Sequence, residues 1–195
     1  MLYRQVHEEH AADWQQFQAS GLYRQLIEQD RLIVHEEAPV AEAFDSQAWM
    51  VLKPRPLEFI SYPYEWTFGQ LKDAALLTLA AQRDAITVGM TLKDASAYNV
   101  QFDNGQPLLI DALSFERRQD DEPWVAYRQF CQHFLAPLAL MALRDVRCGL
   151  LLRDFVDGIP LDLAATLLPW RSRLRTGLAA HLHLHARAQQ RHGTT

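Results

Sequence analysis

Two short apolar runs on either side of Asp103-Asn104-Gly105 constrain the fold of this chain more than any other sequence feature. The first run is Asn99-Val-Gln-Phe102 and the second is Pro107-Leu-Leu-Ile-Asp111. Such runs joined by a turn that contains Asn-Gly are typical of a β-hairpin, because Asn and Gly accept the left-handed backbone that the turn requires. The predicted hairpin sets the polar residues Asn99 and Asp111 near one end.

Hydrophobic periodicity predicts the elements around this hairpin. Leu2–Val6 alternates like a strand, and an apolar stripe from about Ala11 to Gln29 favours a helix that Gly21 interrupts or kinks. Three runs rich in β-forming residues predict strands of a small, mainly antiparallel sheet: Arg31–His35, Trp49–Lys53 and Leu57–Tyr62. Two long helices follow, one from an N-cap at Thr67 to about Gly89, and one after Pro123 that Pro137 kinks.

The composition is that of a folded domain without extreme charge. The chain has 195 residues, 49% of them hydrophobic, which is enough to form a core of one domain with a helical annex. A net charge of -5 gives no electrostatic reason to bind nucleic acid or an anionic membrane. The start lacks the pattern of a secretory signal, and no apolar run approaches the roughly 18 residues of a membrane span, so we expect a cytoplasmic protein. Cys131 and Cys148 lack a metal-type spacing and are expected to be reduced thiols.

The residues that point to chemistry are Asp94, Asn99 and Asp111. Phosphoryl transfer from a nucleotide requires a carboxylate that orients or deprotonates the attacking hydroxyl, and oxygen ligands for the Mg²⁺ that neutralises the phosphates. The sequence supplies this set in the following order: an Asp, four intervening residues, an Asn, a hairpin and a second Asp. Asp94 lies before the hairpin, whereas Asn99 and Asp111 lie on its two legs.

At these residues the chain resembles the protein-kinase-like superfamily, which includes bacterial small-molecule kinases and carries an H-R-D-x-x-x-x-N loop followed by a D-F-G-type strand end. Leu92 and Lys93 replace the His and Arg of that loop, and Asp111-Ala112-Leu113 replaces D-F-G. The resemblance implies an α+β, kinase-like fold with a small antiparallel sheet lobe and a larger, mainly helical lobe. Residues 1–66 would form a reduced N-lobe-like part with strands and a helix. Residues 67–195 would form a helical C-lobe-like part that carries the hairpin.

The resemblance also assigns roles in a phosphotransferase that binds Mg²⁺ and ATP. Asp94 would be the catalytic base, and Asn99 and Asp111 would hold the metal. Arg4 or Lys53 would pair with phosphate, and Tyr64 and Glu65, in a hinge-like Tyr62–Trp66 segment, would contact the nucleotide. The glutamate that partners the phosphate-binding cation stays open among three residues: Glu8, Glu9 and Glu28. No Gly-rich phosphate-covering loop is present in the sequence, which indicates either a missing N-terminal segment or a reduced lobe.

Three longer runs resemble one bacterial family in which such a region precedes a class I S-adenosylmethionine-dependent methyltransferase domain. The runs are Phe59–Trp66, Leu92–Phe102 and Pro123–Phe134. The resemblance implies an alternative function, a non-catalytic kinase-like (pseudokinase) module that regulates or docks on a methyltransferase domain in the same polypeptide. Because the chain shows no G-x-G-x-x-G nucleotide loop, S-adenosylmethionine would bind only to a downstream domain, and we expect the chain to be part of a longer protein.

Each of these features also has a purely structural explanation. Asp94, Asn99 and Asp111 are residue types that cap turns and end strands. The Tyr62–Trp66 segment is equally typical of a packed aromatic corner. The alternating histidines of His181-Leu-His-Leu-His185 suggest a metal site if the segment is a strand, but the surrounding residues favour a helix, which would point His183 elsewhere. The arginines beyond Asp162 are typical of a solvated helix face.

Overall fold

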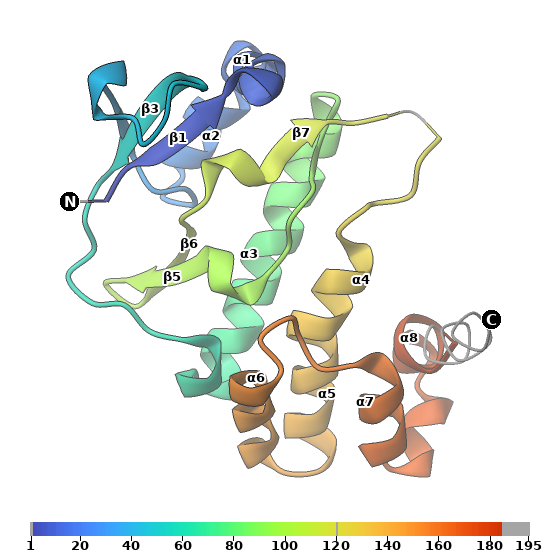
Figure 1. Ribbon diagram of the computed structural model, residues 1–195. Helices are drawn as coiled ribbons and strands as arrows, with labels where there is room; N and C mark the ends of the chain where they lie inside the picture. The colour runs from blue at the N-terminus through green and yellow to red at the C-terminus, as the bar shows by residue number, and fades with distance from the viewer. Residues whose placement is uncertain (1, 120, 185–195) are drawn as a thin grey trace. The chain divides into compact units, whose positions relative to one another are not determined.

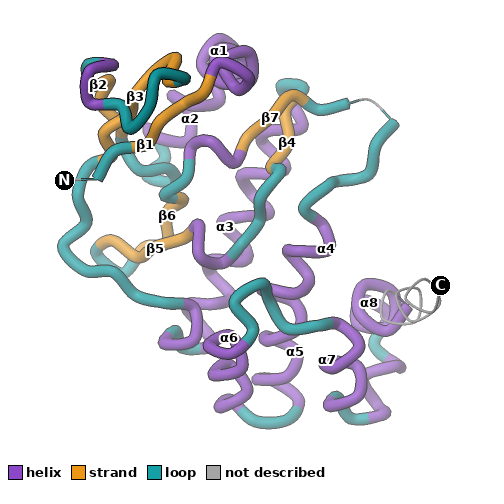
Figure 2. The backbone as a smooth tube through the Cα atoms, in the orientation of Figure 1, coloured by secondary structure: helices purple, strands orange, loops and turns teal. Residues whose placement is uncertain are grey.

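The computed structural model describes residues 2–119 and 121–184, which form a mixed α and β fold with small antiparallel sheets (Figures 1 and 2). The strands are β1 (Arg4–His7), β2 (His35–Ala38), β3 (Ala48–Pro54), β4 (Met90–Leu92), β5 (Val100–Asp103), β6 (Gln106–Leu109) and β7 (Phe115–Arg117). The α-helices are α1 (Ala11–Ala19), α2 (Leu22–Glu28), α3 (Phe68–Thr87), α4 (Tyr127–Phe130), α5 (Ala136–Leu143), α6 (Leu151–Asp154), α7 (Leu161–Leu167) and α8 (Thr176–Leu178). None of the described helices is long and apolar enough to cross a membrane.

The chain divides into two compact units whose segments alternate along the sequence. The first unit comprises Met1–Ile60, Leu77–Asp94 and Asn99–Val125, and the second comprises Ser61–Leu76, Ala95–Tyr98 and Ala126–Thr195. All the strands named above belong to the first unit, whereas the described part of the second unit is helical. The expected boundary between residues 66 and 67 stays a prediction.

The first unit is built on three small sheets. The largest has the order β1-β3-β2, with both outer strands antiparallel to β3, as expected for the small antiparallel sheet. β4 pairs with β7, and β5 pairs with β6 in the predicted hairpin. Its turn has φ 50° at Asn104 and 79° at Gly105, which is the left-handed backbone that the Asn-Gly signal indicated. The hairpin prediction is therefore confirmed.

Helices α1 and α2 supply most of the aromatic core of the first unit. The two helices are separated at Gly21, which has φ 80°, so the predicted interruption is confirmed. Phe17 of α1 is fully buried and stacks on Phe115 of β7 with ring centroids 4.4 Å apart. Trp14 meets Phe17 edge to face, an arrangement that stabilises aromatic pairs beyond their burial.

Two strand predictions were wrong. Leu57–Tyr62 is an irregular segment, because β3 already has a partner on each side and Pro54 and Pro56 precede the segment. In Arg31–His35, Leu32 makes only an isolated bridge to Leu109, and the ladder strand begins at His35 instead.

The helical predictions hold, with one local correction. Thr67 caps α3, since its hydroxyl accepts from Gln70 N–H at 3.3 Å while the Gln70 side chain accepts from Thr67 N–H at 3.0 Å. Gly89, with φ 74°, follows the helix end as expected. The distortion that was expected at Pro137 lies just before it, as a π turn over Cys131–Leu135, because proline cannot supply the N–H that a regular helix requires. Cys131 and Cys148 are free thiols, as predicted.

Candidate functional site

Four polar side chains meet at the open end of the hairpin, and we call them the Asp111 cluster: Arg4, Asn99, Asp111 and Ser114. Arg4 Nη1 donates to Asp111 Oδ1 at 3.0 Å. Ser114 Oγ donates to Asp111 Oδ2 at 2.8 Å, and Asn99 Nδ2 donates to Ser114 Oγ at 3.1 Å. The structure thus brings together three of the residues that the sequence singled out.

Local backbone geometry explains why these side chains converge. Asn99 directly precedes β5 and Asp111 lies two residues after β6, and Ile110 N–H donates to Asn99 O at 2.9 Å, which extends the hairpin pairing. Asp111 caps the short 3₁₀ turn Ala112–Ser114 by accepting from Leu113 N–H at 3.2 Å. This turn brings Ser114 back to Asp111. Sequence reasoning missed Ser114, although an Asp followed three residues later by Ser is a usual signal of a capped turn.

The Arg4–Asp111 pair is partly buried, with 30% of the Arg4 side chain and 16% of the Asp111 side chain exposed. Removing a charge from such a pair leaves its partner poorly solvated, which is costly. Arg4 Nε is buried and has no hydrogen-bond partner among the described residues. Because buried polar atoms normally have a partner, this atom indicates capacity for a further acceptor at the cluster.

His35 lies within electrostatic reach of the same pair and was not predicted as a site residue. Both of its ring nitrogens are buried without a hydrogen-bond partner among the described residues. Burial, and then the positive charge of Arg4, lowers the pKa of His35 to about 4, while Asp111 opposes the shift. The imidazole is therefore neutral near pH 7.

We expect His35 to make the protein less stable as the pH falls from 6.5 towards 4. In this window the unfolded chain protonates His35, whose ordinary pKa is 6.5, while the folded chain with a pKa of about 4 does not. The stabilisation is complete above pH 6.5 and is lost as the pH falls through 4. After allowance for solvent exposure, we expect the loss to be about 1 to 2 kcal/mol, measured by urea unfolding at pH 4.5 and 7.

A matched pair of variants isolates this contribution. His35→Gln should reduce the difference in unfolding free energy between the two pH values, whereas His10→Gln, at a histidine whose side chain is 44% exposed, should leave it unchanged. An unchanged difference in His35→Gln would contradict the assignment.

Backbone bonds connect the segments that carry Asp94 and Lys53 to the elements of the cluster. Asp94 follows β4 and is partly buried, and Lys93 N–H donates to Ser114 O at 2.8 Å. This backbone bond places the residue before Asp94 beside the 3₁₀ turn of the cluster. Lys53 lies on β3, next to the Leu52 position that pairs with Arg4 of β1, and its Nζ is 3.7 Å from Glu36 Oε2.

Arg4 and Lys53 also line one cavity of about 320 Å³, which we call the apolar cavity. A third cation, Arg55, lines it as well. Its remaining lining is aliphatic or proline: Leu2, Ile33, Pro54, Pro56, Leu57, Ile60 and Ile110. Ile110 directly precedes Asp111, so the cavity and the cluster are neighbours in sequence and share Arg4. An apolar cavity with a few convergent polar groups is the usual form of a small-molecule site.

Tyr64 and Glu65 belong to the second unit, in the 3₁₀ turn Pro63–Glu65. The Tyr64 ring stacks on Tyr62 with centroids 5.5 Å apart, and the Glu65 carboxylate accepts from Tyr62 N–H at 2.8 Å. The backbone N–H of Glu65 donates to Tyr62 O at 2.8 Å within the same turn. The segment has the internal bonds of an aromatic corner, and contact of Tyr64 and Glu65 with a nucleotide stays a prediction.

The histidine run does not form a metal site in the part of the chain that the structure describes. His181 Nδ1 contacts the Tyr127 hydroxyl, and the buried His183 is 2.8 Å from Ser172 Oγ through its Nε2. His185 lies outside the described residues. Across residues 2–119 and 121–184, no group of three or more His, Cys, Asp or Glu side chains could hold a metal ion.

Comparison with known proteins finds a nodulation protein, NoeA of Rhizobium meliloti (strain 1021), that is 37% identical to this chain over 173 residues. The match covers 88% of this chain and 36% of NoeA, so the chain spans about a third of the length of that relative. No protein-family model matches the chain.

Proposed function

We propose that this chain is a kinase-like module that binds a nucleotide with Mg²⁺ at the Asp111 cluster and transfers its terminal phosphoryl group. The observation that carries the proposal is the hydrogen-bonded connection of Asp111, Ser114 and Asn99, with Arg4 paired to Asp111. In the kinase-like arrangement that we propose, residues 1–66 form the smaller lobe and residues 67–195 the larger one.

The donor set of the cluster fits Mg²⁺, which prefers carboxylate and amide oxygens. Asp111 supplies two carboxylate oxygens, and Asn99 keeps its Oδ1 for a ligand because its Nδ2 donates to Ser114. When bound, Mg²⁺ would neutralise the phosphate charge that develops during transfer. The Arg4 guanidinium forms an ion pair with Asp111, and its reorientation towards the nucleotide phosphates would release that carboxylate for the metal.

The remaining residues take roles that match their positions. Lys53 provides a second cation for the phosphates, and the aliphatic wall of the apolar cavity provides a surface for the nucleotide base. Asp94 accepts the proton of an acceptor hydroxyl, whose oxygen forms the new bond to phosphorus as the bond to the leaving nucleoside diphosphate breaks. Catalysis of this kind depends on positioning and charge neutralisation.

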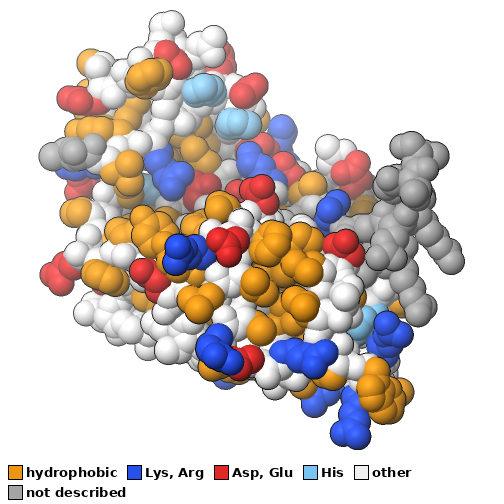
Figure 3. Space-filling model, turned by 60° about the horizontal axis from the view of Figure 1, so that its bottom comes forward, with side chains coloured by type: hydrophobic (Ala, Val, Ile, Leu, Met, Phe, Trp, Pro, Cys, Tyr) orange, Lys and Arg blue, Asp and Glu red, His pale blue; other side chains and the backbone are white. Residues whose placement is uncertain are grey.

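A second candidate function is a non-catalytic module that docks on a methyltransferase domain of the same polypeptide. It is favoured by the ion pair between Arg4 and Asp111, because this pair engages the carboxylate that a phosphotransferase would need for the metal. Exposed apolar side chains also favour it. Trp170 and Leu174 of the second unit are 66% and 73% exposed. Figure 3 shows hydrophobic side chains gathered among charged side chains of both signs on one face. Exposed apolar patches commonly mark interaction sites. The length of NoeA, a nodulation protein, leaves room for another domain in that relative.

Calorimetric titration of ATP into the chain, with and without Mg²⁺, separates the two candidates. We expect binding that requires Mg²⁺ and that weakens at least about tenfold in Asp111→Asn, because the substitution removes a charged metal ligand. Asp73→Asn, at an exposed carboxylate of α3, serves as the control and should bind like the wild type. Circular dichroism confirms that each variant is folded. A folded wild-type chain that binds no nucleotide would contradict the phosphotransferase proposal and support the docking module.

A further inference from the structure

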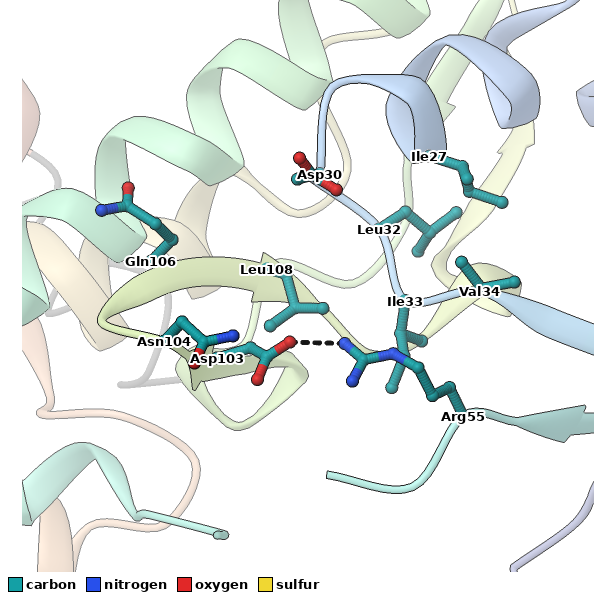
Figure 4. Close-up of a pocket in the computed structure, with 10 residues that line it drawn as sticks. All are labelled: Ile27, Asp30, Leu32, Ile33, Val34, Arg55, Asp103, Asn104, Gln106 and Leu108. Carbon is teal, nitrogen blue, oxygen red and sulfur yellow. Dashed lines mark hydrogen bonds and ion pairs between the residues drawn. The ribbon is translucent and has the colours of Figure 1, made fainter. Parts of the chain in front are cut away.

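A second cavity of about 290 Å³ lies at the tip of the hairpin (Figure 4), and its lining does not include Asp94, Asn99 or Asp111. We call it the Asp103 cavity. It is lined by the end of α2 and the segment after it, by Arg55 beyond β3, and by the hairpin tip: Ile27, Asp30, Leu32, Ile33, Val34, Arg55, Asp103, Asn104, Gln106 and Leu108. All of these residues belong to the first unit. Its volume is at the lower end of that of ligand pockets, so it suits a small molecule.

The polar side chains of the cavity carry an excess of negative charge. Arg55 and Asp103 point toward each other, with Nη2 2.5 Å from Oδ2, so each neutralises the other (Figure 4). The second carboxylate, Asp30, is exposed to solvent, and its side chain has no ion pair or hydrogen bond within residues 2–119 and 121–184. The side chains that line the cavity therefore carry a net charge of one negative unit. An anionic ligand would meet repulsion here, whereas a cation would meet an unpaired carboxylate.

Two amide side chains and an aliphatic floor complete the lining. Asn104 and Gln106 each present one carbonyl acceptor and one NH₂ donor, the combination that hydroxyl groups use best. Leu32 and Leu108, 2% and 5% exposed, close the floor of the cavity, and Val34, which is 45% exposed, offers more surface for aliphatic carbon. The site therefore combines an anionic acceptor, uncharged donors and acceptors, and an apolar contact.

The backbone holds the key polar residues in defined positions. Asp30 has φ 52° at the end of α2, where its N–H donates to Ile27 O at 3.0 Å and the next N–H, of Arg31, donates to Leu26 O at 2.8 Å. Asn104 has φ 50° in the hairpin turn. Both are residue types that tolerate this left-handed conformation. Their side chains thus originate from fixed points on either side of the cavity, which lowers the ordering cost of binding.

We propose that the Asp103 cavity binds a small hydroxylated amine, with its ammonium group at Asp30 and its hydroxyl groups at Asn104 and Gln106. The aliphatic carbons of the ligand lie on Leu32 and Leu108. The Asp103 cavity adjoins the apolar cavity, since Arg55 and Ile33 line both, but Asp30, Asn104 and Gln106 line the Asp103 cavity and are not among the described residues that line the apolar cavity.

Amide-detected NMR titration of the full chain tests the proposal, with D-glucosamine and D-glucose as probes. D-glucosamine carries an ammonium group where D-glucose carries a hydroxyl group, and the two probes are otherwise the same. Binding should shift the side-chain NH₂ signals of Asn104 and Gln106, which Asn104→Asp and Gln106→Glu identify by loss of the signal. We expect D-glucosamine to bind about two- to fivefold more tightly than D-glucose, which is the ratio that one exposed ion pair provides.

Two carboxylate variants provide the matched control. Asp30→Asn should abolish the preference for D-glucosamine while leaving the binding of D-glucose in place. Asp121→Asn should retain the preference, because Asp121 is also an exposed aspartate with a positive φ, of 73°, but does not line the cavity. Equal affinities for the two sugars in the wild type, shifts confined to signals other than the two amides, or no saturable shift would each overturn the proposal.

Discussion

Replacing Asp94 by Asn is expected to slow nucleotide turnover by about 10²- to 10⁴-fold, the range that a positioned general base contributes. The amide has nearly the same shape as the carboxylate but cannot accept the proton of the attacking hydroxyl at neutral pH. Nucleotide affinity should change little, because Asn99, Asp111, Arg4 and Lys53, and not Asp94, would contact the metal and the phosphates. The measurement is the rate of ADP release with Mg²⁺ and ATP, together with the calorimetric affinity of each variant.

A lower turnover rate with unchanged nucleotide affinity is the result that distinguishes a catalytic base from a structural residue. Asp94 is partly buried, and a structural role would lower the thermal midpoint or the affinity as well as the rate. Asp73→Asn, at an exposed position on α3, should leave all three unchanged. Full turnover in Asp94→Asn would exclude the assigned role. A wild-type chain that binds nucleotide without turnover would instead favour a pseudokinase.

The parts of the site that sequence predicted are those fixed by local signals. Asn104-Gly105 specifies a tight turn, and the turn then dictates that Asn99 and Asp111 lie at the same end of the hairpin. The Arg4–Asp111 pair joins residues 107 positions apart, which no local pattern specifies. Its residues were expected near one ligand only because the order of elements resembles that of kinases.

The strand assignments that the sequence did not predict correctly depend on which segments compete to pair with β3 in the folded protein. Leu57–Tyr62 contains good β-forming residues, but both edges of β3 are occupied, and β-propensity alone does not tell which segment takes an edge. His35-Glu-Glu-Ala38 has weak strand propensity yet forms the edge strand β2. The burial of His35 near Arg4 follows from the pairing of β2 with β3, and the polar sequence of this strand does not predict it.

The same reasoning applies to the two cavities. The residues that line the Asp103 cavity come from three separate segments: residues 27–34, Arg55 after β3, and residues 103–108 at the hairpin tip. Each segment taken alone is an ordinary loop or turn. A charge count becomes informative only after folding has shown that Arg55 neutralises Asp103 and leaves Asp30 unpaired.

Replacing Gly158 by Ala is expected to lower the free energy of unfolding by about 2 to 5 kcal/mol, which is a large fraction of the stability of a small protein. Gly158 has φ 90°, a conformation that costs an L residue about 1 to 2 kcal/mol. The added methyl carbon would also lie 2.7 Å from Gln132 Cβ and 2.9 Å from the Gln132 carbonyl carbon. The backbone cannot move away easily, because Ile159 N–H donates to Gln132 O at 3.0 Å. Overpacking of this kind typically costs about 1 to 3 kcal/mol more.

Substitutions at two other glycines separate the cost of the backbone conformation from the cost of the steric clash. Gly89→Ala should cost only the backbone strain, about 1 to 2 kcal/mol, because Gly89 has φ 74° and no atom within 4 Å of the added carbon. Gly177→Ala should be neutral or stabilise by up to about 1 kcal/mol, since Gly177 lies in α8 and has open space around it. Urea unfolding of the three variants gives the order directly. If Gly158→Ala proved no less stable than Gly89→Ala, the close approach of Gly158 to the π turn at Gln132 would be wrong.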